Sequence, residues 1–150
     1  MLPLFEAYLT CLERLHADLR SVLEGVPQEG LDWVPPGPEM NSLAVLAAHV
    51  TGSERYWVGE IAGGDPAHRD RPAEFRTEKV DGTALLAGLE ASLAHSRATL
   101  KQLTMADLET RRLAGDRGEI TVAWALFHSL QHIATHLGQM QMTRQMWEQK

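Results

Sequence analysis

Residues 121–147 read TVAWALFHSLQHIATHLGQMQMTRQMW, and this stretch has the length and periodicity of a long helix. One apolar stripe recurs every three or four positions and consists of Val122, Leu126, Leu130, Ile133, Leu137 and Met140. At about 100° per residue, a second stripe falls roughly 80–160° away and consists of His128, His132, His136 and Gln139. A helix with two specialised faces is buried on both. We therefore expect one face in the protein core and the other at a site or a second subunit.

Three further segments show helical periodicity, at about residues 3–24, 41–62 and 83–103. Asn41 or Ser42 can cap the free N–H groups at the start of the second segment. Asp81 or Thr83 can do the same for the third. The chain therefore carries four helices of about 20–27 residues each.

These helices predict an all-α fold, a four-helix bundle that forms a single domain over residues 1–150. No segment alternates apolar and polar residues with period two over a useful length, so we expect no β-sheet. The long loops at residues 25–40, 63–82 and 104–120 are expected to cover the ends of the bundle.

The composition indicates a globular protein of the cytoplasm. With 44% hydrophobic and 23% charged residues the chain can bury a core, and a formal charge of −6 offers no basic face to nucleic acid. A single cysteine, Cys11, excludes an intrachain disulfide and suits a reducing compartment. The N-terminal stretch is unlike a signal peptide, and no apolar run is long enough to cross a bilayer. We expect no nucleic-acid and no membrane partner.

His132 and His136 form an HxxxH pair, so both imidazoles lie on one face of the long helix and can share a cation. Ile133 stands where the HExxH motif of zincins has its general base. His49, at the apolar edge of the second helix, is the expected third ligand. Three neutral imidazoles suit zinc, nickel, iron or copper and leave a position open for water or substrate. The spacing alone is equally typical of partly buried histidines that only hydrogen-bond to backbone or water.

Three stretches of the chain carry a family pattern. The second helix reads NSLAVLAAHVTGSERYW at residues 41–57, the loop after it reads RDRPAEF at residues 69–75, and the fourth helix carries HxxxHxGQ at residues 132–139. In these stretches, and in the order of its elements over nearly the whole chain, the sequence resembles the DinB/YfiT-like superfamily of small metal-binding four-helix bundles.

The resemblance implies one divalent metal held by His49, His132 and His136, with zinc or nickel expected and iron, manganese or copper as alternatives. His128 and Gln139 are candidates for supporting roles, His128 as a pocket residue or a plain buried histidine and Gln139 as a group that orients bound water. Some relatives transfer a low-molecular-weight thiol (bacillithiol, mycothiol or glutathione) to an electrophile, and one group isomerises maleylpyruvate.

By resemblance we expect a thiol-dependent S-transferase that acts on a small-molecule substrate, with metal-assisted hydrolysis as the alternative reaction. A non-catalytic, stress-linked module that sequesters metal or ligand is the alternative from another class, and a scaffold whose histidines bind nothing is a third. Family habit and the two-faced fourth helix together suggest a homodimer.

Candidate substrate-binding residues are Arg69 and Arg71 in the loop, Trp33 in the first loop and Tyr56 on the second helix. Arginines can hold a carboxylate through bidentate contacts. The alternative for the loop arginines, with Arg76, is a solvated segment balanced by its own acidic residues. For Trp33 the alternative is capping of the bundle, and for Tyr56 it is core packing.

Other reactive side chains have simpler interpretations. We expect Cys11 to be a small packing residue and not a nucleophile. Ser53 and Thr51 lack the glycine pattern of a nucleophile elbow. Glu54 and Arg55 are expected to form a solvated pair.

Overall fold

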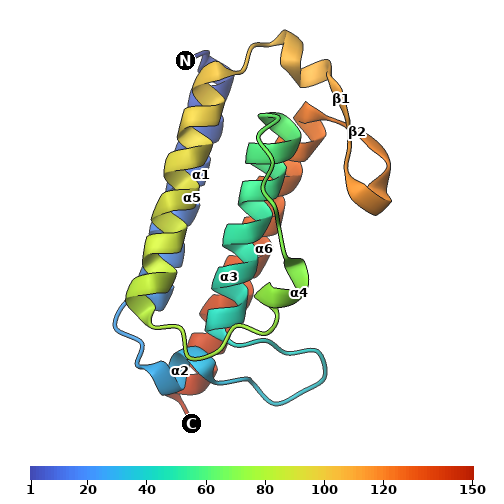
Figure 1. The fold of residues 1–150 in the computed structure, drawn as a ribbon. Coiled ribbons are helices and arrows are strands. Elements are labelled where there is room, and N and C mark those ends of the chain that lie inside the picture. Colours follow the sequence, from blue (N-terminus) through green and yellow to red (C-terminus); the bar gives the residue numbers. More distant parts are fainter.

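The computed structural model describes residues 1–150, and its four long helices form an all-α bundle. They are α1 (Pro3–Leu23), α3 (Leu43–Glu54) with its continuation η1 (Arg55–Ala62), α5 (Gly82–Gln102) and α6 (Val122–Glu148). Helix α1 lies against α5 and α6, and α3 lies against the same two helices. Figure 1 shows the result as two pairs of helices, with α5 in front of α1 and α3 in front of α6. The predicted fold class is confirmed.

Side-chain caps fix where three of the helices begin. The hydroxyl of Ser42 accepts a hydrogen bond from the backbone N–H of Val45 at the start of α3. Asp81 caps α5 and Thr121 caps α6 in the same way. Of the alternatives that the sequence left open, Ser42 and Asp81 are the caps. All four predicted helices begin and end within two residues of the observed bounds.

The core lies between the four helices and contains one large cluster of 23 buried apolar residues. Phe5 and Leu12 come from α1, Val50 from α3 and Leu100 from α5, and each is almost fully buried. The apolar stripe of α6 enters this cluster, except that Leu130 is only partly buried beside it. Burial of such apolar surface stabilises the bundle by about 25 cal/mol per Å².

The second helix changes its hydrogen-bond pattern halfway along. Residues Arg55–Ala62 form the π-helix η1, which ends with a hydrogen bond of 3.0 Å from Gly63 N–H to the carbonyl of Val58. Such wider turns are rare in proteins, and those that occur often lie at functional sites. A rotation of about 100° per residue therefore does not predict which side chains face the core beyond Glu54.

A small β-sheet contradicts the expectation that the chain contains none. Strand β1 (Arg111–Leu113) pairs in antiparallel fashion with β2 (Glu119–Thr121), and the helical turn η3 (Gly115–Arg117) joins them. Each strand has three residues, which is too short for a period-two pattern to be visible in the sequence. In Figure 1 this hairpin projects sideways from the end of the bundle at which α6 begins.

The long loops contain three more short elements, α2 (Gln28–Asp32), α4 (Arg71–Glu74) and η2 (Ala106–Glu109). Figure 1 shows α2 near the end of α6, and α4 beside the middle of α3. No helix of the structure combines the length and the apolarity that crossing a membrane requires.

Candidate metal centre

Three histidine side chains from two helices converge on one point. His49 comes from α3, and His132 and His136 come from adjacent turns of α6. The Nε2 atom of His132 lies 3.0 Å from Nε2 of His49 and 3.1 Å from Nε2 of His136. Two nitrogen atoms that each lie about 2.0–2.1 Å from one ion are themselves about 3.0–3.4 Å apart. The three residues are therefore positioned to bind a metal ion.

The hydrogen bonds behind the rings determine which nitrogens carry protons. His49 Nδ1 lies 2.8 Å from a carboxylate oxygen of Glu74, and His136 Nδ1 lies 2.7 Å from the amide oxygen of Gln139. Because these oxygens only accept, each Nδ1 is the donor and each Nε2 presents a lone pair. His132 Nε2 can donate to only one of them. If His132 Nε2 carries a hydrogen, one of the two neighbouring lone pairs is left without a donor, and if it carries none, its own lone pair faces both of them. Either arrangement suits a cation between the rings.

Their environment favours the neutral form of the two α6 imidazoles, His132 and His136, and this is the form that binds metals. Burial, the largest cause, and the neighbouring histidines together lower the pKa of His132 to about 3. Burial also lowers the pKa of His136, although the hydrogen bond with Gln139 acts against it. Nδ1 of His132 is buried without a hydrogen-bond partner, so only two of the three rings are oriented from behind.

Glu74 on the short helix α4 was not predicted as part of the site. Besides His49, it accepts hydrogen bonds from Arg69 Nε at 2.6 Å and from Arg69 Nη2 at 2.8 Å. Burial alone would raise the pKa of Glu74, but the hydrogen bonds from Arg69 and His49 outweigh it and hold that pKa below its ordinary value. Arg69 is therefore committed to a charged Glu74 and is not a solvated loop residue.

Local backbone features bring this carboxylate to His49. Asp70 caps α4 by accepting from the backbone N–H of Ala73 at 3.0 Å. A Cβ atom at Gly52 of α3 would collide with the Glu74 carboxylate, so only glycine leaves room for it. The sequence signal for Glu74 was its place in the RDRPAEF segment, but the pairing with a histidine 25 residues away depends on the fold.

An open cavity of about 340 Å³ lies beside the histidines. Of the predicted substrate-binding residues, Arg69, Arg71 and Tyr56 line it, and Trp33 does not. His128 also lines it, in contact with the ring of Trp57 at a centroid distance of 4.8 Å. Trp33 follows α2 and is half-buried, so capping of the bundle remains a prediction for it.

The hairpin between β1 and β2 supplies Ala114 and two charged residues, Asp116 and Arg117, to this cavity. Sequence reasoning missed both, because the hairpin itself was not predicted. The only signal was the GDRG segment, in which Gly115 and Gly118 have φ values of 54° and 72°. Glycine adopts such values without strain, and here it permits the turn that brings Arg117 to the cavity.

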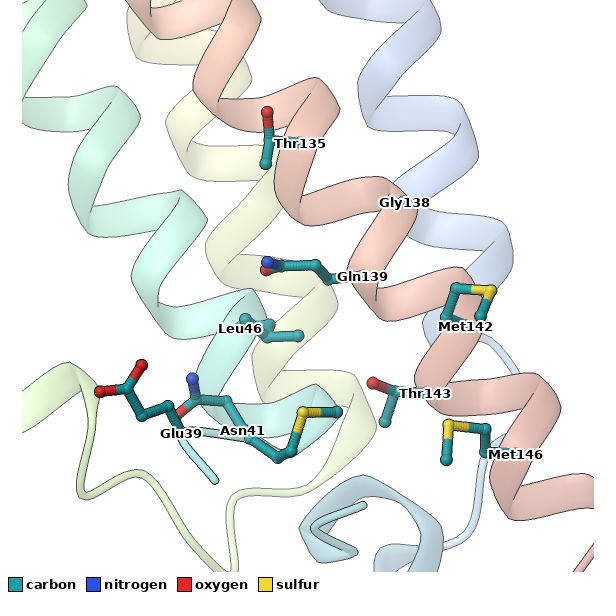
Figure 2. Close-up of a pocket in the computed structure, with 10 residues that line it drawn as sticks. Glu39, Asn41, Leu46, Thr135, Gly138, Gln139, Met142, Thr143 and Met146 are labelled. Carbon is teal, nitrogen blue, oxygen red and sulfur yellow. The ribbon is translucent and has the colours of Figure 1, made fainter. Parts of the chain in front are cut away.

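A second cavity, of about 490 Å³, lies between the start of α3 and the second half of α6. Figure 2 shows Leu46 of α3 on one side of it and Thr135, Gln139 and Met142 of α6 on the other. Gln139 belongs to both regions, because its amide oxygen also holds His136. The side chains around the metal position therefore adjoin two separate cavities.

The interpretation of Glu54 and Arg55 as a solvated pair was wrong. Glu54 is not solvated but fully buried, 2.6 Å from His16 Nε2, and it accepts a second hydrogen bond of 2.6 Å from Ser96. Its expected partner Arg55 pairs with Asp65 at 2.7 Å. The wrong prediction arose because a charged residue beside an apolar stripe is typical of a surface position.

The remaining candidates divide between core, surface and cavity. Cys11 is exposed on α1 and does not fill the core as expected. The hydroxyl of Thr51 donates to the carbonyl of Ala47, which satisfies it within its own helix. Ser53 is buried and lines the cavity beside His49.

Comparison with known proteins identifies the family. The model of the DinB superfamily matches residues 12–140. The chain belongs to the DinB superfamily. This membership agrees with the resemblance found in the sequence. No curated protein matches the chain.

Several solved structures share the fold of this DinB superfamily member. A conserved protein from Enterococcus faecalis is 18% identical and aligns over 100% of both chains, with a TM-score of 0.78. A DinB-like protein from Bacillus subtilis, YjoA, is 16% identical and aligns over 95% of this chain and 92% of its own, with a TM-score of 0.73. A mycothiol-dependent maleylpyruvate isomerase is 16% identical, with a TM-score of 0.70. The alignment covers 93% of this chain but only 61% of the isomerase.

Proposed function

We propose that this protein is a divalent-metal-dependent enzyme that transfers a low-molecular-weight thiol to a small electrophile. The observation that carries the proposal is the set of three converging Nε2 atoms beside an open cavity lined by arginines. No fourth histidine, cysteine or carboxylate joins the set. Such a site resembles catalytic metal centres, which keep a position for substrate, and not structural ones, which are closed by four protein ligands.

When bound there, zinc or nickel would act as a Lewis acid and lower the pKa of a thiol or a water in its open position. The protein's own contribution is orientation. Glu74 holds His49 and Gln139 holds His136 in the tautomer that presents Nε2 to the metal position. Arg69 keeps Glu74 charged and in place.

A transfer between two substrates needs room for both, and the structure offers two cavities. One reaches His49 and His132, and the other reaches Gln139 behind His136. One of the similar structures is that of a mycothiol-dependent isomerase, which supports thiol chemistry on this fold. We propose that the thiol and the electrophile approach from these two sides.

The test is thiol conjugation by protein loaded with zinc or nickel. Glutathione, bacillithiol and mycothiol are each offered with the neutral electrophile 1-chloro-2,4-dinitrobenzene, and the conjugate is measured by mass spectrometry. We expect turnover that needs both thiol and metal, that stops with a chelator and that returns when metal is added. Substitution His49→Ala should remove it, whereas Arg112→Gln on the exposed face of β1 should not.

The other outcomes identify the alternatives. Chelator-sensitive hydrolysis of p-nitrophenyl acetate without any thiol would contradict thiol transfer and indicate a metal-dependent hydrolase. About one bound metal per chain with no turnover in either assay would indicate a metal-binding module. Far less than one metal per chain in unchelated protein would contradict the metal centre itself.

We also propose that the protein is a homodimer that pairs through an apolar face of α1 and α6. Leu4 and Phe127 are 42% and 65% exposed there, and Cys11 and Leu130 line the same face. Monomers rarely leave such a patch uncovered. Analytical ultracentrifugation should show a dimer for the native chain and a monomer for Phe127→Asp. A monomeric native chain at micromolar concentration would contradict the proposal.

A further inference from the structure

The cavity beside the histidines contains more positive charge than its own side chains neutralise. It is lined by Arg69, Arg71, Arg117 and Asp116. Arg69 is occupied, because its Nε and Nη2 atoms both donate to Glu74. Arg71 and Arg117 take part in none of the ion pairs that involve arginine, nor in any side-chain hydrogen bond. Two free guanidinium groups therefore face the cavity, against one exposed carboxylate.

Arg117 is held in place by aromatic rings and not by hydrogen bonds. Its Cζ atom lies 5.2 Å from the ring centre of Trp124 and 5.7 Å from that of Trp57. Trp124 in turn stacks on His128, with a centroid distance of 4.6 Å and an interplanar angle of 13°. These contacts involve no hydrogen bond, so the N–H donors of Arg117 stay free for a ligand.

Arg71 repeats this arrangement from another part of the chain. Its Cζ atom lies 4.9 Å from the ring centre of Phe75, and the Phe75 ring lies 4.8 Å from that of the expected metal ligand His49. Each free guanidinium group thus stands one aromatic ring away from a histidine of the cavity. One comes from α4 and the other from the η3 turn, so the two groups reach the same cavity from two elements.

We propose that Arg71 and Arg117 bind an oxyanion group, a carboxylate or a phosphonate, of the electrophile, which is thus an acidic molecule. This inference rests on the proposed function, because it assigns the anion to the electrophile of the thiol transfer. Arginine presents paired N–H donors that match both oxyanions. Side chains already held by aromatic contacts lose less conformational freedom on binding. Arg69 has a different role, because its donors are spent on Glu74.

Binding of simple anions to zinc-loaded protein tests the assignment without any turnover. Isothermal titration calorimetry compares succinate and methylphosphonate with succinamide, the neutral analogue of succinate. We expect one or both anions to bind and succinamide not to bind. Arg71→Gln and Arg117→Gln should each weaken anion affinity roughly tenfold, since each removes a charge-assisted contact. Arg112→Gln, on the same hairpin but outside the cavity, should leave anion affinity unchanged.

Zinc affinity of every variant is measured in parallel by competition with a chelator dye, and we expect no change. Loss of anion binding without loss of zinc supports the assignment, and the preferred anion shows whether carboxylate or phosphonate is the better match. Anion binding that survives both substitutions overturns it, as does the absence of binding by either anion at millimolar concentration.

The two proposals fail in different ways. Arginine-dependent anion binding in a protein that conjugates no thiol would contradict the transferase and keep the anion site. If the protein conjugates 1-chloro-2,4-dinitrobenzene but its anion affinity does not change when either arginine is substituted, the transferase proposal stands and the anion site is rejected.

Discussion

The structure contains two buried histidine–glutamate pairs, and only one of them belongs to the candidate site. His16 Nε2 lies 2.6 Å from Glu54, and His49 Nδ1 lies 2.8 Å from Glu74. In both pairs the side chains are less than a tenth exposed. By distance and burial the two pairs are alike, so neither property by itself distinguishes a site from a structural contact.

The surroundings separate the two pairs. Glu54 receives its second hydrogen bond from Ser96, so this pair joins α1, α3 and α5 in the bundle interior. His49 instead presents its other ring nitrogen to His132, beside an open cavity. A buried histidine–carboxylate pair is therefore a structural contact when its neighbours satisfy it. It becomes a candidate metal site when the free ring nitrogen of its histidine lies next to unprotonated ring nitrogens of other histidines.

The largest effect should follow from His132→Ala, which removes the ring between the other two. We expect the metal content, measured by inductively coupled plasma mass spectrometry, to fall from about one ion per chain to near zero. The fold should suffer little, because His132 is only half-buried and its Nδ1 atom holds no hydrogen bond.

His128→Ala is the matched control one turn away on α6 and should keep the metal. Its ring stacks on Trp124 but is not among the converging nitrogens. Full metal occupancy in the His132 variant would show that the three rings do not form the centre.

The structural pair is tested by Glu54→Ala. This change leaves His16 and Ser96 without their partner in the core, and breaking a buried pair costs about 3–5 kcal/mol of unfolding free energy. Urea denaturation measures the loss, and zinc affinity should stay unchanged. Glu13→Ala is the control at a partly exposed ion pair and should cost about 1 kcal/mol or less. A Glu54 variant that loses zinc but not stability would reverse the roles of the two pairs.

The sequence was sufficient for features that depend on local spacing. Apolar periodicity placed the four helices, and HxxxH placed His132 and His136 on one face of α6. His49 was expected as the third ligand from its place at the apolar edge of the second helix, and the family resemblance pointed to the same residue. The apolar pattern predicted the helices because the residues that form it are the residues that pack in the core.

Features that depend on tertiary contacts could not be predicted in this way. Glu74 approaches His49 across 25 residues of chain, and Arg117 reaches the cavity from a hairpin of three-residue strands. Glu54 was expected at the surface, because its burial depends on partners from two other helices. The helix also changes from α to π after Glu54, so a constant rotation of about 100° per residue does not place the side chains beyond that point.

An intermediate effect should follow from Glu74→Gln, which keeps the size of the side chain and removes its charge. His49 then loses its carboxylate acceptor and Arg69 its counter-ion. We expect zinc affinity to fall about 10–100-fold, the usual result of losing a partner behind a metal ligand. Competition with a chelator dye measures the change. Glu78→Gln, an exposed neighbour four residues on, is the control and should bind zinc as the native chain does. Unchanged zinc affinity in the Glu74 variant would show that the His49–Glu74 pair is a structural contact, like the His16–Glu54 pair.

The smallest effect is expected from Gly52→Ala, which moves the carboxylate without removing it. In a helix this substitution ordinarily stabilises by about 0.5–1 kcal/mol, but the added methyl group would collide with Glu74. The carboxylate must retreat from His49, so zinc affinity should fall severalfold, less than in Glu74→Gln. Gly88→Ala on α5 is the matched control, because its methyl group would meet Thr51 at an ordinary 3.8 Å. If both variants keep native zinc affinity, the position of the Glu74 carboxylate does not matter to the metal.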